Sequence, residues 1–466
     1  MKKKEIAKNV ILSLLICVCV FLFYKIWFSE KLWSSDYNFF ASLWGNSQNL
    51  SDTSSSIEDI LTPKNIIFSG GGKRFVSTKG DADFDGYYAE VKEILGKVSE
   101  KTSKFTLTTE DEMLSAIKST SVSVDFGTVF GGEIGGYIGT YFPAKQLKEV
   151  VISLSDSALG KPVVYIRDRA DGEIYKTAVD VPLAQFAETV LAHLEKHSSG
   201  NLPFAFELGF HMSKQTEESE ISQDILLNSN ILIGLTDVEA PEISVSAPKN
   251  TGLTSSQASL ILRQFGMDKT SARKYIETND AIIYVDGGAT LKISPTGTLE
   301  YTAQTEGPEI YNPSSKDALP VAVGNIFSYI RRIIREFDTN TPPLQISSDL
   351  VNLSDNTEEV TINIDYYINS IPVMAWENKH AITVTMKNGK LVSYTQQVCD
   401  LETQEEMLSA GNMLQAVDGL YETLPEGTKA TVSDLFVAYT AEDTLSWCAR
   451  LDSDDSLIII DREGAE

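Results

Sequence analysis

An uncharged apolar run near the start of the chain is its most pronounced hydrophobic feature. The run begins at Val10, carries no charge as far as Tyr24 and stays apolar to Phe28 apart from Lys25. Its length of about 19 residues is close to the roughly 20 that a helix needs to cross a bilayer. Four lysines precede it: Lys2, Lys3, Lys4 and Lys8. The pattern predicts a transmembrane helix with its N-terminus in the cytoplasm.

The residues that follow this run indicate that it is not removed. A cleaved signal peptide has a shorter apolar region and small residues at the cut site. Here the flank is bulky, with Tyr24, Ile26, Trp27 and Phe28. We therefore expect residues 1–28 to be an uncleaved anchor, with the C-terminal region outside the cell membrane. A cleaved signal peptide is the alternative.

Strand and helix patterns alternate after a tether. Residues 29–62 are rich in serine and asparagine, which is typical of a linker. Residues 63–200 predict an N-terminal α+β domain. Within it, Gly70–Gly72 separate two strand patterns, as the turn of a hairpin does. An apolar stripe of helical period predicts its last helix: Leu183, Phe186, Val190, Leu191 and Leu194.

Residues 201–310 predict a β-rich middle domain that contains one short helix. Its most regular stretch is "DAIIYVDGGATLKISPTGTLEYTAQ". The turn residues Asp286-Gly287-Gly288 and Pro295-Thr296-Gly297 predict two consecutive hairpins. Between them Leu291 and Ile293 alternate with polar residues, which predicts a sheet with one buried face.

The C-terminal domain, residues 311–466, contains an internal repeat of one helix followed by antiparallel strands, with copies at about 311–400 and 401–466. The stripe of the first helix consists of Leu319, Val323, Ile326, Ile330, Ile333 and Phe337. The second helix is predicted from a capping box, Thr403 and Glu406, and from a stripe of Met407, Ala410, Leu414, Val417 and Tyr421.

Short motifs support the repeat and its strands. Ser348-Asp349-Leu350 and Ser433-Asp434-Leu435 fall at the same place in each copy, and Asn388-Gly389 predicts a hairpin turn in the first copy. In one strand of that copy Ile362, Ile364, Tyr366 and Ile368 are expected to face one way. Chance similarity of two α+β stretches is the alternative to a true repeat.

The charge of the chain limits the kinds of molecule that it binds, and its few cysteines limit the disulfides that it forms. The formal net charge is −26, and residues 1–28 hold five lysines and one glutamate, so the remainder carries −30. A strongly acidic exported region repels nucleic acid and anionic lipid. Outside the anchor only Cys399 and Cys448 remain. They form either one disulfide or two small buried hydrophobes.

No motif in the chain predicts catalysis, a cofactor or a metal. Gly70–Gly72 and Lys73 lack the spacing and the Ser or Thr of a phosphate loop. His193 and His197 share a helix face, but position 194 is leucine where a zinc protease needs glutamate, so we expect a solvated helix end. The segment "DADFDG", Asp81 to Gly86, lacks the spacing and distal glutamate of a calcium loop.

The order of these elements resembles one family. The lysine-flanked anchor precedes a long acidic region, and the block "DAIIYVDGGATLKISPTGTLEY" precedes a helix. "INIDYYINSIPVM" then leads into a glycine-turned hairpin, and "LFVAYTAEDTLSWCARLD" with "IIID" closes the chain. Over its whole length the chain resembles the YycH/YycI regulators of Gram-positive bacteria, and most closely the longer YycH type. One departure is Ser446, where the family tends to have a proline before the tryptophan.

The resemblance implies a single-pass, non-enzymatic membrane protein that controls the WalK (YycG) sensor histidine kinase of the WalK–WalR system. It also implies pairing with a YycI-like paralogue, anchors that contact the transmembrane helices of the kinase, and helix-on-sheet units in the C-terminal domain that look like the PepSY type. Whether control is positive or negative stays open.

Two interaction surfaces follow from the sequence. Within the anchor, a loose stripe of Asn9, Ser13, Cys17 and Tyr24 suits contact with another transmembrane helix. A chance arrangement of these residues is the alternative. The alternative function is an extracytoplasmic module that binds a peptide or a cell-wall fragment. Its candidate residues are Tyr366, Tyr367 and Trp376, although core packing is the better expectation for Tyr366.

Overall fold

The computed structural model describes most of the chain after Leu61, with gaps. The described ranges are 62–98, 105–131, 142–154, 160–197, 202–210, 224–248, 253–304, 307–315, 318–339, 343–347, 350, 359–376, 380–425, 428–452 and 456–460. They lie in one unit, Glu58–Glu466. Within them, no helix has the length and apolar character needed to span a membrane. The predicted anchor, its stripe and the tether lie outside the described residues.

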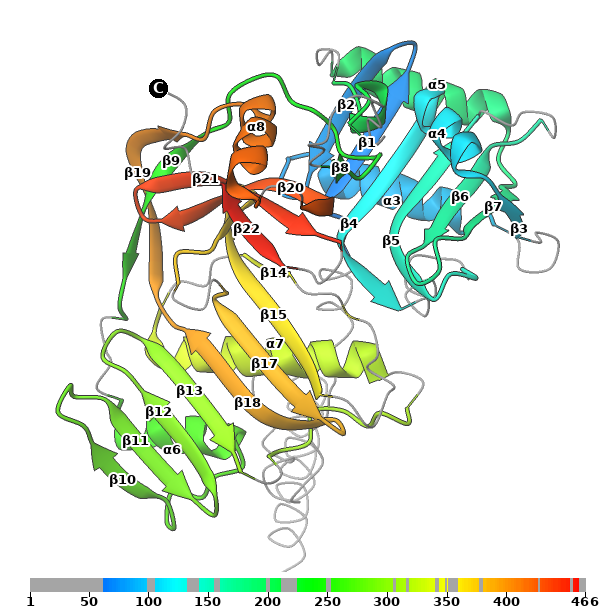
Figure 1. The fold of residues 1–466 in the computed structure, drawn as a ribbon. Coiled ribbons are helices and arrows are strands. Elements are labelled where there is room, and N and C mark those ends of the chain that lie inside the picture. Colours follow the sequence, from blue (N-terminus) through cyan, green and yellow to red (C-terminus); the bar gives the residue numbers. More distant parts are fainter. Residues whose placement is uncertain are drawn as a thin grey trace, which may run out of the picture. The chain divides into compact units, whose positions relative to one another are not determined.

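The described part of the chain is an α+β structure built on antiparallel sheets, as predicted, and its first sheet has seven strands in the order β2-β1-β4-β5-β6-β7-β3 (Figure 1). The bounds of its strands are β1 Asn65–Gly70, β2 Lys73–Thr78, β3 Thr106–Thr108, β4 Ser121–Gly131, β5 Gln146–Ser153, β6 Val163–Asp168 and β7 Ile174–Ala178.

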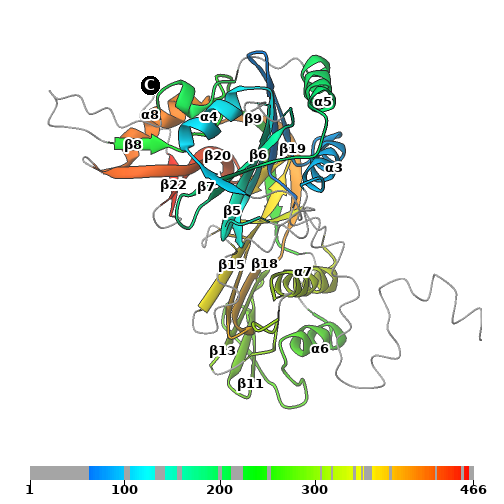
Figure 2. The same ribbon diagram turned by 90° about the vertical axis from the view of Figure 1, so that its right-hand side faces the viewer.

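Helices cover both faces of this sheet (Figure 2). On one face lie α3 (Phe84–Leu95) and α5 (Leu183–Lys196); the ring of Phe68 on β1 contacts Tyr87 of α3 and His193 of α5. On the other face α4 (Glu110–Lys118) packs Met113 and Ile117 against Ile67 of β1. Because neighbouring residues of a strand point to opposite faces, Ile67 and Phe68 anchor the two layers.

The second sheet has 13 strands and begins at the predicted middle domain. Its path is β10-β11-β12-β13-β18-β17-β15-β16-β20-β21-β22, with β14 and β8 attached to β15 and β20. The bounds are β8 Asp224–Leu227, β10 Arg273–Ile276, β11 Ile282–Asp286, β12 Ala289–Ile293, β13 Thr298–Ala303, β14 Leu344–Ile346, β15 Glu359–Ile368, β16 Ile371–Val373, β17 Ile382–Lys387, β18 Lys390–Gln397, β20 Lys429–Ala441, β21 Thr444–Leu451 and β22 Leu457–Ile460.

Helices α6 (Ser255–Gln264) and α7 (Ala318–Phe337) lie on the same side of this sheet, as Figure 2 shows. All six residues of the stripe predicted for α7 are buried, and so are Leu291 and Ile293 on β12. Of the predicted β15 face, Ile362, Ile364 and Tyr366 are buried and Ile368 is half-buried. The opposite face of β10–β18 is polar and rich in threonine, which explains the alternation seen in the sequence.

The turn predictions are confirmed. Gly71 and Gly72 join β1 to β2 with φ of +59° and +76°, a region that only glycine enters without cost. Asn388 and Gly389 join β17 to β18, also with positive φ. At Gly297 in the β12–β13 turn, an added Cβ would lie 2.0 Å from the carbonyl oxygen of Val398. Glycine is therefore required there by a close backbone approach as well as by its φ of +90°.

The predicted start of the second repeat helix is wrong. Residues Asp400–Ser409 form strand β19, which pairs antiparallel with β9 (Glu239–Ser246). Thr403 and Glu406 therefore do not cap a helix, and Met407 is 56% exposed. Helix α8 (Met413–Thr423) begins after Gly411, with a capping box of Asn412 and Gln415. Strand β9 lies far away in sequence, and pairing with its edge outweighs the helical spacing of the apolar residues in this segment.

The last helix predicted for residues 63–200 is confirmed as α5. Of its apolar stripe Phe186, Val190 and Leu194 are buried, and Leu191 is 44% exposed. The segment "LPFAFELGF", expected to be part of a β-rich stretch, holds a short 3₁₀ helix, Ala205–Glu207. The predicted domain boundaries near residues 200 and 310, and the comparison with PepSY units, stay predictions.

Cys399 and Cys448 are free thiols in buried positions, so the alternative of two small buried hydrophobes is confirmed. Burial, with a smaller contribution from the Asp400 charge, raises the pKa of the Cys399 thiol to about 12. A thiol with such a pKa stays protonated and is a poor nucleophile.

Ile330 is the central residue of the α7 stripe and is fully buried. The variant Ile330→Ala is expected to lower the free energy of unfolding by about 2–5 kcal/mol, since it leaves a cavity under the sheet. Urea denaturation of the purified chain, followed by tryptophan fluorescence, measures the loss. The matched control is Arg331→Ala on the exposed side of the same helix, for which we expect a change below about 0.5 kcal/mol. Equal losses in both variants would contradict the assignment of the buried face.

Candidate functional site

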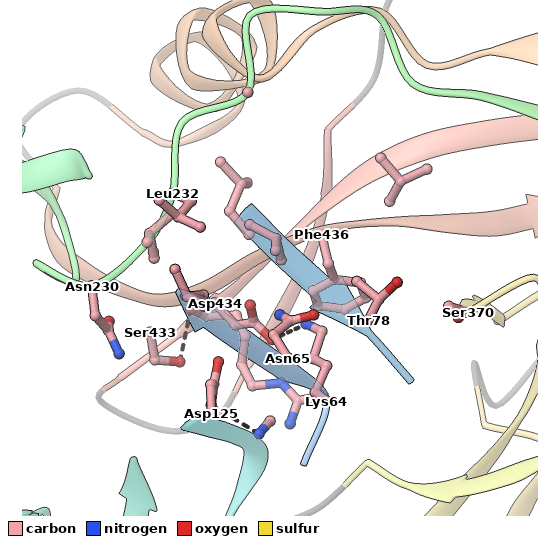
Figure 3. A pocket seen from close by; sticks show the side chains of 18 of the residues that line it. Lys64, Asn65, Thr78, Asp125, Asn230, Leu232, Ser370, Ser433, Asp434 and Phe436 are labelled. Atoms are coloured by element: carbon pink, nitrogen blue, oxygen red, sulfur yellow. Dashed lines mark hydrogen bonds and ion pairs between the residues drawn. The ribbon is translucent and has the colours of Figure 1, made fainter. Parts of the chain in front are cut away.

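A cavity of about 450 Å³ lies between the α4 side of the first sheet and strand β20 of the second (Figure 3). Strands β1, β2 and β4 supply Asn65, Thr78 and Asp125 on one side. Strand β20 supplies Ser433, Asp434 and Phe436 on the other. Its volume lies within the range of about 300–1,000 Å³ that small-molecule sites occupy.

One row of side chains across the first sheet faces this cavity. Asn65 on β1 lies opposite Asp125 on β4, and Asp125 lies opposite Glu149 on β5. On β6, Arg167 brings its Nε within 3.4 Å of Glu149 Oε1. Because residues in register share a face, antiparallel pairing alone gathers these polar groups from segments far apart in sequence.

Lys64, just before β1, forms an ion pair with the second sheet. Its Nζ lies 2.9 Å from Asp434 Oδ2 and 5.1 Å from the centre of the Phe436 ring. Lys148 adds a buried hydrogen bond, donating from Nζ to the Ser433 carbonyl oxygen at 3.1 Å. Both contacts fix β20 against the first sheet.

The cations around Asp434 decide its charge state. Burial by itself would raise the pKa of this carboxyl, but Lys64, Lys148 and Arg450 outweigh burial and lower the pKa to about 2. Asp434 is therefore ionised throughout the physiological range. A carboxylate whose folded pKa is depressed stabilises the fold above its unfolded pKa.

Glu149 is in the opposite situation. Burial raises the pKa of its carboxyl above the ordinary value, Arg167 opposes that rise, and Asp125 adds to it. The Asn230 side-chain amide donates a hydrogen bond to Glu149 Oε2. The cavity therefore carries one carboxylate held in the charged form and one whose charged form is disfavoured.

The structure describes Leu350 of one predicted Ser-Asp-Leu motif and all of the other, Ser433-Asp434-Leu435, and both contact the first sheet or the residue before it. From the second copy, Ser433 and Asp434 receive the contacts from Lys148 and Lys64. From the first copy, the Leu350 backbone N–H donates to the Val129 carbonyl oxygen at 2.7 Å, and the Gly131 N–H donates to the Leu350 carbonyl oxygen at 3.3 Å. Leu350 thus joins the C-terminal part of the chain to β4, and Ser433 and Asp434 join it to β5 and to Lys64 before β1.

The three residues proposed for peptide binding do not all face the same site in the structure. Tyr366 is buried and donates from its hydroxyl to the Gln397 carbonyl oxygen at 2.8 Å, while Trp376 packs edge-on against its ring. Tyr367 points to the other side and lines the cavity. Core packing is therefore confirmed for Tyr366, and only Tyr367 reaches the candidate site.

Near the cavity, Ser347, Asp365 and His380 come together, a set that sequence reasoning missed. His380 Nδ1 lies 3.1 Å from Asp365 Oδ1 and 3.4 Å from Ser347 Oγ. In a hydrolase triad the acid and the nucleophile contact opposite ring nitrogens of the histidine, so that one orients the ring and the other loses its proton. Here both reach the same nitrogen, so the geometry gives an oriented histidine and no activated serine.

The sequence suggested that His193 and His197 lie at a solvated helix end, and this prediction is wrong. His197 stacks on Phe75 with ring centres 4.2 Å apart, and its Nε2 lies 2.7 Å from the Tyr87 hydroxyl. His193 Nε2 lies 2.8 Å from Glu90 Oε2. The two histidines are part of an aromatic cluster that fixes α3 and α5 to β1 and β2. Among the described residues, no group of three or more metal-ligating side chains is placed to hold a metal ion.

Comparisons with known proteins support the fold alone. No protein-family model matches the chain, and no curated protein matches it significantly. The structure is similar to the crystal structure of YycH from Bacillus subtilis, with a TM-score of 0.56 and 12% sequence identity. The similarity covers 87% of this chain and 97% of that chain. The YycH-like fold is therefore shared over almost the full length of that structure.

The Lys64–Asp434 ion pair predicts a pH-dependent stability. Asp434→Asn is expected to destabilise the fold by about 3 kcal/mol at pH 7, since it leaves Lys64 without its buried partner. The folded pKa of Asp434 is about 2, below the unfolded value of about 3.9, so its contribution is complete above pH 4 and is lost as the pH falls toward 2. The difference between the two proteins must therefore shrink over that interval.

Thermal unfolding of both proteins between pH 3 and pH 8 measures this difference. Asp443→Asn, an exposed carboxyl at the turn between β20 and β21, is the matched control and should change little. A constant difference down to pH 3, or an equal effect at Asp443, would contradict the ion pair as its source.

Proposed function

We propose that the protein is a non-catalytic, membrane-anchored extracytoplasmic regulator of a sensor histidine kinase of the WalK/YycG type. The observation that carries this proposal is the fold likeness to YycH, which extends over 87% of the chain. The order of sequence blocks that resembles the YycH/YycI family supports the same conclusion independently. The regulator uses no cofactor, and its action consists of protein contacts.

The anchor determines where these contacts occur. Residues 1–28 span the cell membrane once, with the lysine-rich N-terminus in the cytoplasm and the acidic remainder outside. The kinase is contacted within the membrane by the stripe of Asn9, Ser13, Cys17 and Tyr24. A YycI-like paralogue forms a heterodimer with the chain, and the PepSY-like helix-on-sheet units of the exported region provide further protein contacts.

Control follows from unequal binding to two states of the kinase. A regulator changes an equilibrium only by the difference between its affinities for the two states. A tenfold preference corresponds to about 1.4 kcal/mol, which a few small-residue contacts and hydrogen bonds between transmembrane helices supply. The large exported body then adds contacts outside the membrane that favour the same state.

The variant Ser13→Leu tests the intramembrane contact. Replacing a small hydroxyl by a bulky side chain removes both the close approach and about 0.6 kcal/mol of hydrogen bonding, about threefold in an equilibrium. A reporter of the kinase's response regulator should move toward the output of a strain that lacks the chain, with the protein level unchanged.

The matched control is Val18→Leu, which enlarges a residue about 140° around the helix from Ser13. Its output should stay at the parental level. Parental output from Ser13→Leu, or equal shifts from both variants, would remove the stripe from the proposal.

The cavity favours one alternative, a module that binds a peptide or cell-wall fragment without direct kinase control. Its volume and the position of Tyr367 in its lining are the supporting observations. Purified full-length chain with muropeptides separates the two functions: a ligand at 100 times its dissociation constant stabilises the protein by about 2.7 kcal/mol. A shift in unfolding temperature that Tyr367→Ala abolishes would favour this alternative, and no shift would exclude muropeptides as its ligands.

A further inference from the structure

One end of the 13-stranded sheet is an open edge. The sheet path ends at β10 and at β22. Strand β22 is half-buried, whereas all four residues of β10 are exposed. Two of them are large and apolar, with Tyr275 51% and Ile276 65% exposed. The register of β10 with β11 is continuous, and β10 contains no proline, so it lacks two of the usual devices that prevent edge pairing.

The hydrogen-bond pattern shows which backbone groups of β10 face outward. The Glu277 N–H donates to the Ala281 carbonyl oxygen at 2.9 Å, and these two residues continue the register in which Tyr275 lies opposite Ile283. Because hydrogen-bonded and non-hydrogen-bonded pairs alternate in an antiparallel ladder, Tyr275 and Arg273 bond inward to β11. The N–H and C=O groups of Lys274 and Ile276 therefore point outward from the sheet.

The sequence of this edge is complementary to itself. From Arg273 to Glu277 the chain reads "RKYIE". When two copies of it run antiparallel and are centred on Tyr275, Lys274 of each lies opposite Ile276 of the other, and these are the residues whose backbone groups face outward. Four backbone hydrogen bonds then form, and Arg273 of each copy lies opposite Glu277 of the other. A single register thus satisfies the backbone, the charges and the apolar side chains.

We propose that β10 is a self-association edge, through which two copies of this chain pair by antiparallel strand addition about a twofold axis. A twofold interface requires a surface that is complementary to itself, and this strand meets that condition. The paired sheets continue into one another through β10 of each copy. The proposal concerns the exported region alone and is independent of the proposed control of a kinase.

Side-chain positions on β10 fit this pairing. Arg273, Tyr275 and Glu277 share the polar face of the sheet, while Lys274 lies on the other face, with its Nζ 6.0 Å from the centre of the Tyr284 ring. The two Tyr275 side chains meet in a non-hydrogen-bonded pair, where side chains approach most closely. The alkyl stem of Lys274 covers Ile276 of the other copy.

The charges of β10 and of Glu277 after it favour pairing with a second copy of this chain over pairing with an unrelated strand. Arg273 makes no ion pair with any residue that the structure describes. Glu277 holds Lys292 at 3.0 Å, yet its side chain stays 38% exposed, which leaves an oxygen for the partner's arginine. In a chain of net charge −26, the two copies repel each other overall, so the local Arg273–Glu277 pairs supply the attraction that sets the register.

Disulfide crosslinking of the full-length chain in membranes tests the proposal. Tyr275→Cys places two thiols at the twofold axis, with Cβ atoms about 4.5–5.5 Å apart, within or close to reach of a disulfide. We expect a crosslinked dimer on mild oxidation. The controls are the parent chain, which reports on native cysteines, and Thr302→Cys, an exposed position on the same face but on strand β13. A Tyr275→Cys yield no higher than that of either control would overturn the proposal.

Charge reversal in the Tyr275→Cys chain tests the register. Arg273→Glu and Glu277→Arg each place like charges opposite one another at two symmetric positions, and each should lower the rate of crosslinking about tenfold. Co-expression of the two variants with different tags restores both opposite-charge pairs in the mixed dimer, so mixed crosslinks should return to the level of Tyr275→Cys alone. Equal yields in all combinations would overturn this register and with it the self-complementary edge.

Discussion

The joining of the two large sheets depends on charged side chains that are largely buried between them. A charged group is buried at acceptable cost only when a partner of opposite sign and further hydrogen bonds are in place. Lys64 and Asp434 are 370 residues apart in sequence and meet only when the first sheet and β20 are both formed. The Lys148–Ser433 hydrogen bond and the Asn230–Glu149 contact impose the same condition. The strands of the first sheet and strand β20 therefore depend on each other.

The same contacts between the sheets determine which charged groups line the cavity. Its walls carry a carboxylate kept ionised by three cations and another whose ionisation burial opposes. The nearby Ser347, Asp365 and His380 share the residue types of a hydrolase but use one histidine nitrogen for both contacts. The arrangement supplies attachment between segments that are distant in sequence.

Local features were predictable from the sequence and long-range ones were not. The turns at Gly71-Gly72 and Asn388-Gly389, and the buried stripe of α7, depend on neighbouring residues alone. Strand β19 was missed because its partner β9 lies far away in sequence. The spacing of apolar residues shows that a helix is possible, but it does not show that a strand partner exists elsewhere. The cavity was missed for the same reason. A partial signal existed in the repeated Ser-Asp-Leu motif, whose second aspartate proved to be the partner of Lys64.

The proposed regulator requires that residues 1–28 remain attached to the folded body, because control within the membrane is impossible without them. Mass spectrometry of the mature polypeptide, recovered separately from the membrane fraction and the culture medium of a producing bacterium, tests this requirement. The account predicts a membrane-bound chain that retains residues 10–28. A mature chain found free in the medium, starting beyond Ser29, would contradict it.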